Sequence, residues 1–211
     1  MAATPSHSQS GTKERIIRAA EDLVIRDGVS KLTIEAAANE AGLSKGGVLY
    51  HFPSRDALVS AMLARFVESF DEDLEHHGAL GDQPGDFTRA YVVATLEPTD
   101  EPDEPDVPDE PDDVRDRSLS GALLAGMASD PRLLAPLRER FDHWQARIER
   151  DGLDPAIATL LRLAADGIWL SDLFGVAPVH GELRKRVGEA LARLLEDSID
   201  AGPGRGKGAQ G

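Results

Sequence analysis

Apolar residues recur at helical spacing along most of the chain. Residues 12–27 form one such stretch and end before a glycine, and a longer pattern begins at Ser54 and continues to Gly78. Pro131 and Pro155 each follow an aspartate, the arrangement of an N-cap and a first helical residue. Further helices are predicted at about residues 86–96, 115–128, 131–150, 154–174 and 180–199. Because no useful alternating strand pattern is found, the sequence predicts an all-α fold.

Two short helices are predicted within Leu32–Phe52, which reads LTIEAAANEAGLSKGGVLYHF. Thr33 is suited to cap the first helix and Ser44 to cap the second. Ala38 is small where the two helices would cross, and Gly42 tolerates the positive φ of a sharp turn. This spacing is typical of a helix-turn-helix, whose second helix enters the major groove of DNA.

Composition narrows the function classes. The chain has 211 residues, 41% of them hydrophobic and 5% aromatic, which favours a helical core of Leu, Ala, Val and Ile. It contains no cysteine, which excludes disulfides and thiol chemistry and fits a cytoplasmic location. No apolar stretch approaches about 18 residues, so no membrane partner is predicted. Nucleophile elbow, phosphate loop and HExxH motifs are missing, so an enzyme is the least favoured class, and no catalytic residue, cofactor or metal is predicted.

The net charge of −15 is unevenly distributed. Residues 1–60 carry seven basic and seven acidic side chains, so the excess lies downstream. Residues 97–113 alone contain ten acidic residues and five prolines, which predicts an extended solvated loop in preference to a cation trap or a DNA mimic. The polar residues 1–11 are predicted to be a disordered leader and residues 201–211 a flexible tail.

Residues 12–65 resemble the tetracycline-repressor (TetR) family of bacterial transcriptional regulators. The resemblance rests on the leading amphipathic helix, on TIEAAANEAGLSKGGVLYHF and on its continuation PSRDALVSAML. Downstream, PRLLAPLRERFDHWQARI and LLRLAADGIWLSDLFG are similar to ligand-domain helices of some members. The resemblance implies about nine helices. They would form a three-helix helix-turn-helix DNA-binding domain over 12–53 and a helical ligand-binding and dimerisation bundle over 54–200.

The resemblance also implies contacts with a double-stranded DNA operator. Phosphate or base contacts are expected from Thr33, Ser44, Lys45, Tyr50, His51 and Arg55. Gly46 is common in the family, whereas Gly47 and Leu49 depart from its usual residues, which leaves few side chains to read bases. Gly47 is therefore expected to permit close backbone approach or thymine-methyl contact, with DNA shape supplying the remaining specificity. The alternative is a helical small-molecule-binding or scaffold protein without sequence-specific DNA recognition.

The last two predicted helices carry apolar stripes that core packing explains in part. The resemblance implies that they also form a four-helix interface between two subunits, so a homodimer on a palindromic operator is expected. The predicted interface residues are Ile157, Leu161, Ile168, Leu183, Val187, Leu191 and Leu194.

Most aromatic residues lie in the C-terminal domain, where they either fill the core or line an apolar cavity. A ligand-responsive repressor would bind a small, largely apolar effector there and be released from DNA. The predicted ligand-binding residues are Tyr91, Met127, Phe141, Trp144, Asp166 and Trp169, with His143 and Asp172 as further polar candidates.

Overall fold

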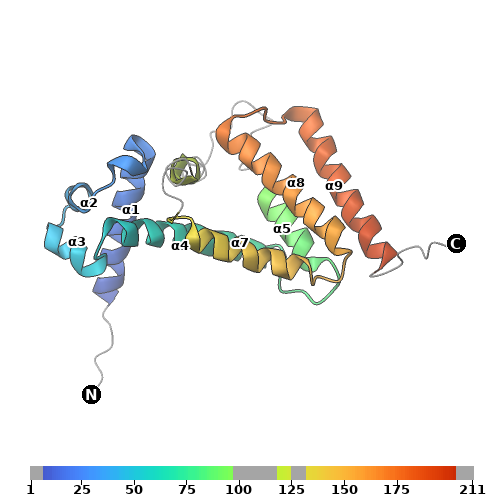
Figure 1. The fold of residues 1–211 in the computed structure, drawn as a ribbon, viewed down its shortest axis with the longest axis horizontal. Helices are drawn as coiled ribbons and strands as arrows, with labels where there is room; N and C mark the ends of the chain where they lie inside the picture. The colour runs from blue at the N-terminus through green and yellow to red at the C-terminus, as the bar shows by residue number, and fades with distance from the viewer. Residues whose placement is uncertain (1–6, 97–117, 125–131, 203–211) are drawn as a thin grey trace, which may run out of the picture. The chain divides into compact units, whose positions relative to one another are not determined.

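A computed structural model describes residues 7–96, 118–124 and 132–202 of the chain. Within these ranges every regular element is helical, as Figure 1 shows, so the predicted all-α class is confirmed. A short helical stretch also covers residues 118–124. The named elements are α1 (His7–Asp27), η1 (Val29–Lys31), α2 (Ile34–Glu40), α3 (Lys45–His51), α4 (Arg55–His76), α5 (Asp86–Leu96), α7 (Ala135–Ile148), α8 (Pro155–Phe174) and α9 (Gly181–Ala201).

Most helix boundaries agree with the sequence predictions, but the start of α1 does not. The helix begins at His7, inside the predicted leader, because a helix that has nucleated on an amphipathic face adds one hydrogen bond for each further residue. α7 begins only at Ala135, after a turn over residues 132–134. The predicted acidic loop, part of the 115–128 helix and nearly all of the C-terminal tail lie outside the described residues.

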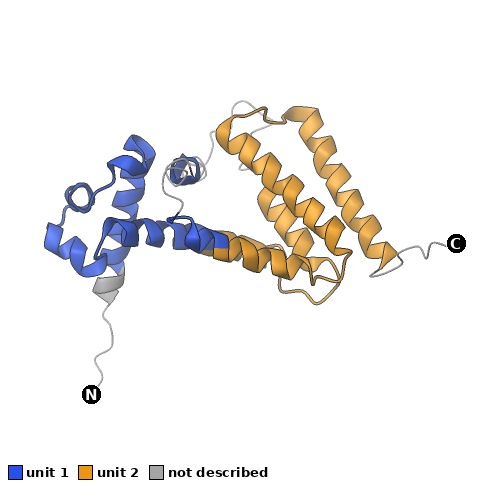
Figure 2. Cartoon of the chain, in the orientation of Figure 1, with its two compact units in different colours: residues 1–67, 114–138 blue, residues 68–113, 139–211 orange. Residues whose placement is uncertain are grey.

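Two compact units make up the chain, as Figure 2 shows. The first comprises residues 1–67 and 114–138, and the second comprises residues 68–113 and 139–211. α4 and α7 contribute residues to both units, whereas α1, α2 and α3 belong to the first and α5, α8 and α9 to the second.

The core of the first unit is built from buried residues of α1, α2, α3 and the start of α4. Ile16, Ala20 and Val24 recur every four residues on α1 and are fully buried, as the helical spacing predicts. Ala37 on α2 and Val48 on α3 are also inaccessible, and α2 packs against both α1 and α3. The short helices are therefore held by a shared apolar core.

The second unit is organised around α8. α5 and α9 both pack against this helix, and α5 also contacts α9. Ala158, Leu161 and Ala165 on α8 are fully buried, and Trp144 and Ile148 on α7 are 2% and 0% exposed. The burial of Leu161 corrects its prediction as a dimer-interface residue, because its side chain fills the core of its own chain.

Candidate DNA-binding and effector sites

The two short helices begin at hydroxyl caps, as predicted. The Thr33 Oγ1 accepts a 3.0 Å hydrogen bond from the Ala36 backbone N–H, and the Ser44 Oγ accepts one of 3.1 Å from Gly47. Each hydroxyl retains its own hydrogen for donation. Both capping residues are exposed, so each hydroxyl is able to donate to a phosphate at a helix start.

A tight turn sets the angle between α2 and α3. Gly42 adopts a φ of 63°, in the left-handed region that glycine occupies without steric cost. The Leu43 N–H then donates a 2.9 Å hydrogen bond back to the Ala38 carbonyl oxygen. Ala38 itself is 2% exposed, consistent with the predicted need for a small side chain there.

The outer face of α3 is open to solvent. Val48 points into the core with no exposed surface, whereas Lys45, Gly46, Leu49 and Tyr50 are exposed. Tyr50 is the most accessible of these side chains at 74%, and its ring meets that of His51 edge-on with centroids 5.1 Å apart. Leu49 is not among the predicted contacts, although its position four residues after Lys45 places it on the same helical face.

An ion pair joins α3, the predicted recognition helix, to α2. The Lys45 Nζ lies 3.6 Å from the Glu35 Oε2, and both side chains are more than half exposed. Glu35 carries a negative charge next to the surface that would meet DNA phosphates. Composition alone gives no sign of this pairing, because the turn between the two helices brings the residues together.

The two glycines of α3 differ in the space around them. A Cβ added to Gly46 would meet only the Ser44 Oγ, at 4.0 Å, which is ordinary contact. A Cβ on Gly47 would lie 3.3 Å from the same oxygen, a tighter approach. The fold of this chain therefore gives no reason for a glycine at position 46.

Arg55 occupies a different environment from the one predicted. Its Nε donates a 3.0 Å hydrogen bond to the Leu32 carbonyl oxygen, and its Nη2 donates one of 2.9 Å to that of Val29. Its Nη1 lies 3.4 Å from the Asp56 Oδ1. The guanidinium thus ties the start of α4 to η1 and to the residue before the cap of α2. This geometry favours a positioning role over a phosphate contact.

In the second unit, aromatic side chains from α4, α5 and α7 meet around Trp144. The Trp144 ring contacts Phe70 and Phe141 edge-on, at centroid distances of 4.9 and 5.1 Å. Phe70 also contacts Tyr91, at 5.4 Å. The structure thus brings three predicted ligand-binding residues, Tyr91, Phe141 and Trp144, into one aromatic cluster. Phe70 completes the cluster and was not predicted.

A polar network borders the aromatic cluster. The Tyr91 hydroxyl donates a 2.8 Å hydrogen bond to the Asp166 Oδ1, and the Arg162 Nη1 donates one of 2.5 Å to the Asp166 Oδ2. Arg162 also donates from its Nε to the Gln145 Oε1, at 2.6 Å. Burial raises the pKa of Tyr91 and that of Asp166 above their ordinary values.

Asp71 on α4 provides a second acidic group beside the cluster. Its Oδ1 accepts a 2.9 Å hydrogen bond from the Trp144 Nε1, and its carboxylate also pairs with Arg140. The Arg140 Cζ lies 5.6 Å from the centroid of the Trp144 ring. The roles of Phe70 and Asp71 were not predicted, because the partners of these residues on α7 lie about 70 positions away in the sequence.

The remaining effector candidates are scattered. Trp169 is half-buried on α8, and Asp172 pairs with Arg184 at 2.6 Å. His143 lines a separate hollow near the end of α7. Met127 lies outside the described residues.

The predicted dimer residues other than Leu161 are accessible to different degrees. Leu183 is 57% exposed, and the others are half-buried. α8 also exposes an apolar stripe that extends beyond the predicted interface residues, formed by Leu160, Leu163, Leu170 and Phe174. These positions are separated by three, seven and four residues, so they share one side of the helix.

Comparison with known proteins agrees with this architecture. Residues 16–62 match the family model "Bacterial regulatory proteins, tetR family". Residues 85–196, more than half of the chain, match the "Tetracyclin repressor-like, C-terminal domain". The fold and the helix-turn-helix thus define a transcriptional regulator of bacterial type.

Individual relatives extend over most of the chain. The HTH-type transcriptional regulator BetI of Stenotrophomonas maltophilia is 27% identical over 182 residues, covering 83% of this chain and 88% of BetI. The structure of the multidrug binding protein EbrR complexed with ethidium matches with 27% identity and a TM-score of 0.62, covering 87% of this chain and 98% of that one. A TetR-family member from Streptomyces coelicolor A3 matches with 26% identity and a TM-score of 0.63, covering 87% and 97%. The chain belongs to the TetR family of transcriptional regulators.

Two further observations bear on the function classes. The family is one of regulators, not of enzymes. None of the helices in the described part of the chain is long and apolar enough to cross a membrane.

Proposed function

We propose that this regulator is a repressor that binds a palindromic operator as a homodimer and is released by a small, largely apolar effector. The observation that carries the proposal is the outer face of α3, where Lys45, Gly46, Leu49 and Tyr50 are exposed on a helix fixed by a capped turn. A helix presented in this way is suited to lie in a major groove. A regulator of this family would act on DNA in the cytoplasm.

Phosphate and base contacts would come from the residues around this face. The hydroxyls of Thr33 and Ser44 and the ring hydroxyl of Tyr50 are accessible donors, and Lys45 supplies a positive charge. His51 lies beside Tyr50 at the end of the helix. Gly46 and Gly47 would allow the helix to approach the base edges closely, and the exposed methyls of Leu49 are suited to thymine.

Salt-dependent binding to the DNA upstream of the gene tests this interface. Fluorescence anisotropy should show that affinity for the specific fragment falls as salt rises and exceeds affinity for random DNA. Lys45→Gln should weaken binding about tenfold and reduce the salt slope by about 1. Lys185→Gln, which removes an exposed lysine of α9, is the matched control and should leave binding unchanged. Equal affinity for random and specific DNA would contradict the proposal.

The homodimer is supported by the exposed stripe on α8. Leu160, Leu163, Leu170 and Phe174 are each at least 41% exposed, and a contiguous apolar face of this kind is typical of a protein interface. The half-buried Ile157, Ile168, Val187, Leu191 and Leu194 and the exposed Leu183 would border it. A second copy, related by a two-fold axis, would cover the stripe with its own.

Light scattering after size exclusion tests this interface. The wild-type chain should elute with the mass of a dimer at micromolar concentration, and Leu163→Glu should convert it to a monomer. Leu80→Glu changes a leucine that is 70% exposed outside the stripe and should remain dimeric. A wild-type monomer would contradict the proposed interface.

The effector is proposed to bind against the aromatic cluster of Phe70, Tyr91, Phe141 and Trp144. Asp71 and Asp166 border the cluster and would orient a polar group of the ligand. The similar EbrR has been solved with ethidium, a flat aromatic compound, which supports an aromatic site. Phe70 and Arg55 lie on the same helix, α4, so an effector that shifts this helix would bias the position of the recognition helix.

Trp144 provides the readout for effector binding. Titration with malachite green, with no DNA present, should quench tryptophan fluorescence, and Phe141→Ala should weaken binding about tenfold, whereas Leu80→Ala should not. Operator binding that no compound of a broad library affects would contradict release by an effector.

A further inference from the structure

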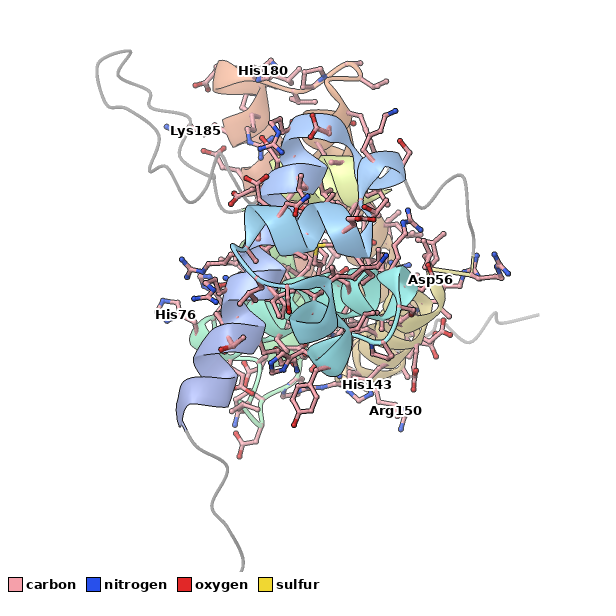
Figure 3. The ribbon with its side chains drawn as sticks, turned by 90° about the vertical axis from the view of Figure 1, so that its left-hand side faces the viewer. Asp56, His76, His143, Arg150, His180 and Lys185 are labelled. Atoms are coloured by element: carbon pink, nitrogen blue, oxygen red, sulfur yellow. The ribbon has the colours of Figure 1, made fainter. Side chains whose placement is uncertain are left out.

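A hollow of about 330 Å³ lies between the segment that follows α4 and the last turns of α7. Its walls include Ala79, Phe87, His143, Arg147, Arg150 and Asp151. Figure 3 labels His143 and Arg150 in neighbouring positions on this part of the molecule. None of these residues belongs to the aromatic cluster, so the hollow is a second potential ligand site within the same unit.

Arg147 is held in place before any ligand binds. Its Cζ lies 3.9 Å from the centroid of the Phe87 ring, and its Nη2 donates a 2.8 Å hydrogen bond to the Ala79 carbonyl oxygen. Stacking on an aromatic face and a backbone bond fix the plane of the guanidinium. The remaining N–H groups keep their orientation without a side-chain acceptor among the described residues.

Arg150 follows Arg147 by three residues and His143 by seven, so the three side chains succeed one another along the end of α7 and the turn after it. Arg150 lies two residues beyond the end of α7, and its Nε donates a 2.9 Å hydrogen bond to the Ala146 carbonyl oxygen in the last turn of that helix. Neither Arg147 nor Arg150 forms an ion pair with any carboxylate in the described ranges. This is notable in a chain with 38 acidic and 23 basic residues, where acidic partners are abundant.

The one carboxylate in the walls is directed elsewhere. The Asp151 Oδ1 accepts a hydrogen bond of 3.2 Å from the Phe87 N–H, and its Oδ2 accepts one of 2.7 Å from the Thr88 N–H. Both oxygens therefore serve the first turn of α5, where a negative charge is favoured. The polar side chains that remain around the hollow are the guanidinium groups of Arg147 and Arg150 and the imidazole of His143.

We propose that this hollow binds a small organic oxyanion, either a carboxylate or a phosphate monoester. Guanidinium groups bind both kinds of anion with paired, charge-assisted hydrogen bonds. The Phe87 ring and the methyl group of Ala79 offer an apolar wall for the organic part of such a ligand. The volume lies at the small end of the range for metabolite sites.

Isothermal titration calorimetry on the full chain, with benzoate and phenyl phosphate as probes, tests the site. At matched ionic strength, at least one probe should bind with 1:1 stoichiometry while chloride gives no signal. Tighter binding of phenyl phosphate identifies a phosphate monoester as the ligand class, and tighter binding of benzoate identifies a carboxylate. Either result supports the proposal.

Substitutions locate the binding. Arg150→Gln should weaken binding at least tenfold without loss of helical circular dichroism, because the side chain's hydrogen bond is local, to Ala146 four residues earlier. Arg147→Lys keeps the charge but removes the planar fork and should also weaken binding. Arg138→Gln, an exposed arginine near the start of α7, is the control and should bind like the wild type. Absence of heat with both probes, or equal weakening by Arg138→Gln, would overturn the proposal.

Discussion

The Tyr91 hydroxyl on α5 donates a 2.8 Å hydrogen bond to the Asp166 carboxylate on α8. Tyr91 is 1% exposed, so the bond lies inside the second unit and joins two of its packed helices. A buried polar group costs free energy unless it is hydrogen-bonded, which makes each partner dependent on the other. The pair therefore contributes both to stability and to the polar edge of the proposed effector site.

Removing the hydroxyl should destabilise the protein. We expect Tyr91→Phe to lower the free energy of unfolding by about 1–2 kcal/mol, since Asp166 would lose a buried donor. Urea denaturation followed by circular dichroism measures the change. Tyr50→Phe removes the hydroxyl of a tyrosine that is 74% exposed and should leave stability within experimental error. Equal effects of the two substitutions would show that the buried bond contributes nothing.

The Asp166 carboxyl should make stability depend on pH. Burial raises its pKa in the folded protein, so the folded chain holds this proton more tightly than the unfolded chain does. The resulting stabilisation is present below the ordinary carboxyl pKa of about 4 and is lost as pH rises through the folded value. Unfolding free energies measured from pH 4 upward should therefore fall more steeply for the wild type than for Asp166→Asn. An identical pH slope for the two proteins would refute this coupling.

Gly46 offers a substitution that separates stability from DNA binding. An added Cβ meets no atom closer than 4.0 Å, and alanine favours a helix over glycine by up to about 1 kcal/mol. Gly46→Ala should therefore raise the thermal midpoint of the protein. If the glycine allows α3 to approach DNA closely, the same variant should bind the operator at least tenfold more weakly by anisotropy.

Gly11→Ala is the matched control for this experiment. Gly11 lies in α1, and nothing lies within 4 Å of a Cβ added there. This variant should gain stability and keep its affinity for DNA. A Gly46→Ala protein with unchanged affinity would exclude close approach at that position.

Glu35 should weaken DNA binding, because its carboxylate lies 3.6 Å from the Lys45 ammonium and beside the predicted path of the phosphates. Glu35→Gln should strengthen operator binding about two- to fivefold at low salt, and the gain should shrink as salt screens the charges. Anisotropy titrations at several salt concentrations measure this. Glu139→Gln, an exposed change of equal charge on α7, should give no gain. A salt-independent effect of Glu35→Gln would argue against an electrostatic cause.

The helix-turn-helix was predictable because its defining bonds are local. Thr33 and Ser44 each accept from an amide three positions further along, and the Gly42 turn closes onto Ala38. The partners of such contacts lie within five residues of each other, so a local sequence pattern is enough to predict them. The same holds for the buried face of α1, whose apolar positions follow the period of a helix.

Features that depend on distant partners were predicted less well. Arg55 looked like a phosphate contact, but its acceptors are backbone carbonyls more than 20 positions earlier, which no side-chain pattern records. Leu161 was assigned to the dimer interface because the family resemblance implies that the last two helices pair between subunits, although α8 is apolar on more than one side. Packing against both α5 and α9 decides which of these sides is buried. The Asp71 bond to Trp144 likewise depends on tertiary structure.

The hydrogen bonds of Arg55 connect the two ends of the helix-turn-helix segment. Arg55 lies only four residues after the end of α3, yet its guanidinium donates hydrogen bonds to the carbonyl groups of Val29 and Leu32, which precede the cap of α2. A displacement of the first turn of α4 would therefore move both ends of the segment that contains α2 and α3 at the same time. The helix-turn-helix would then rotate as one rigid unit, with no change in the angle between α2 and α3.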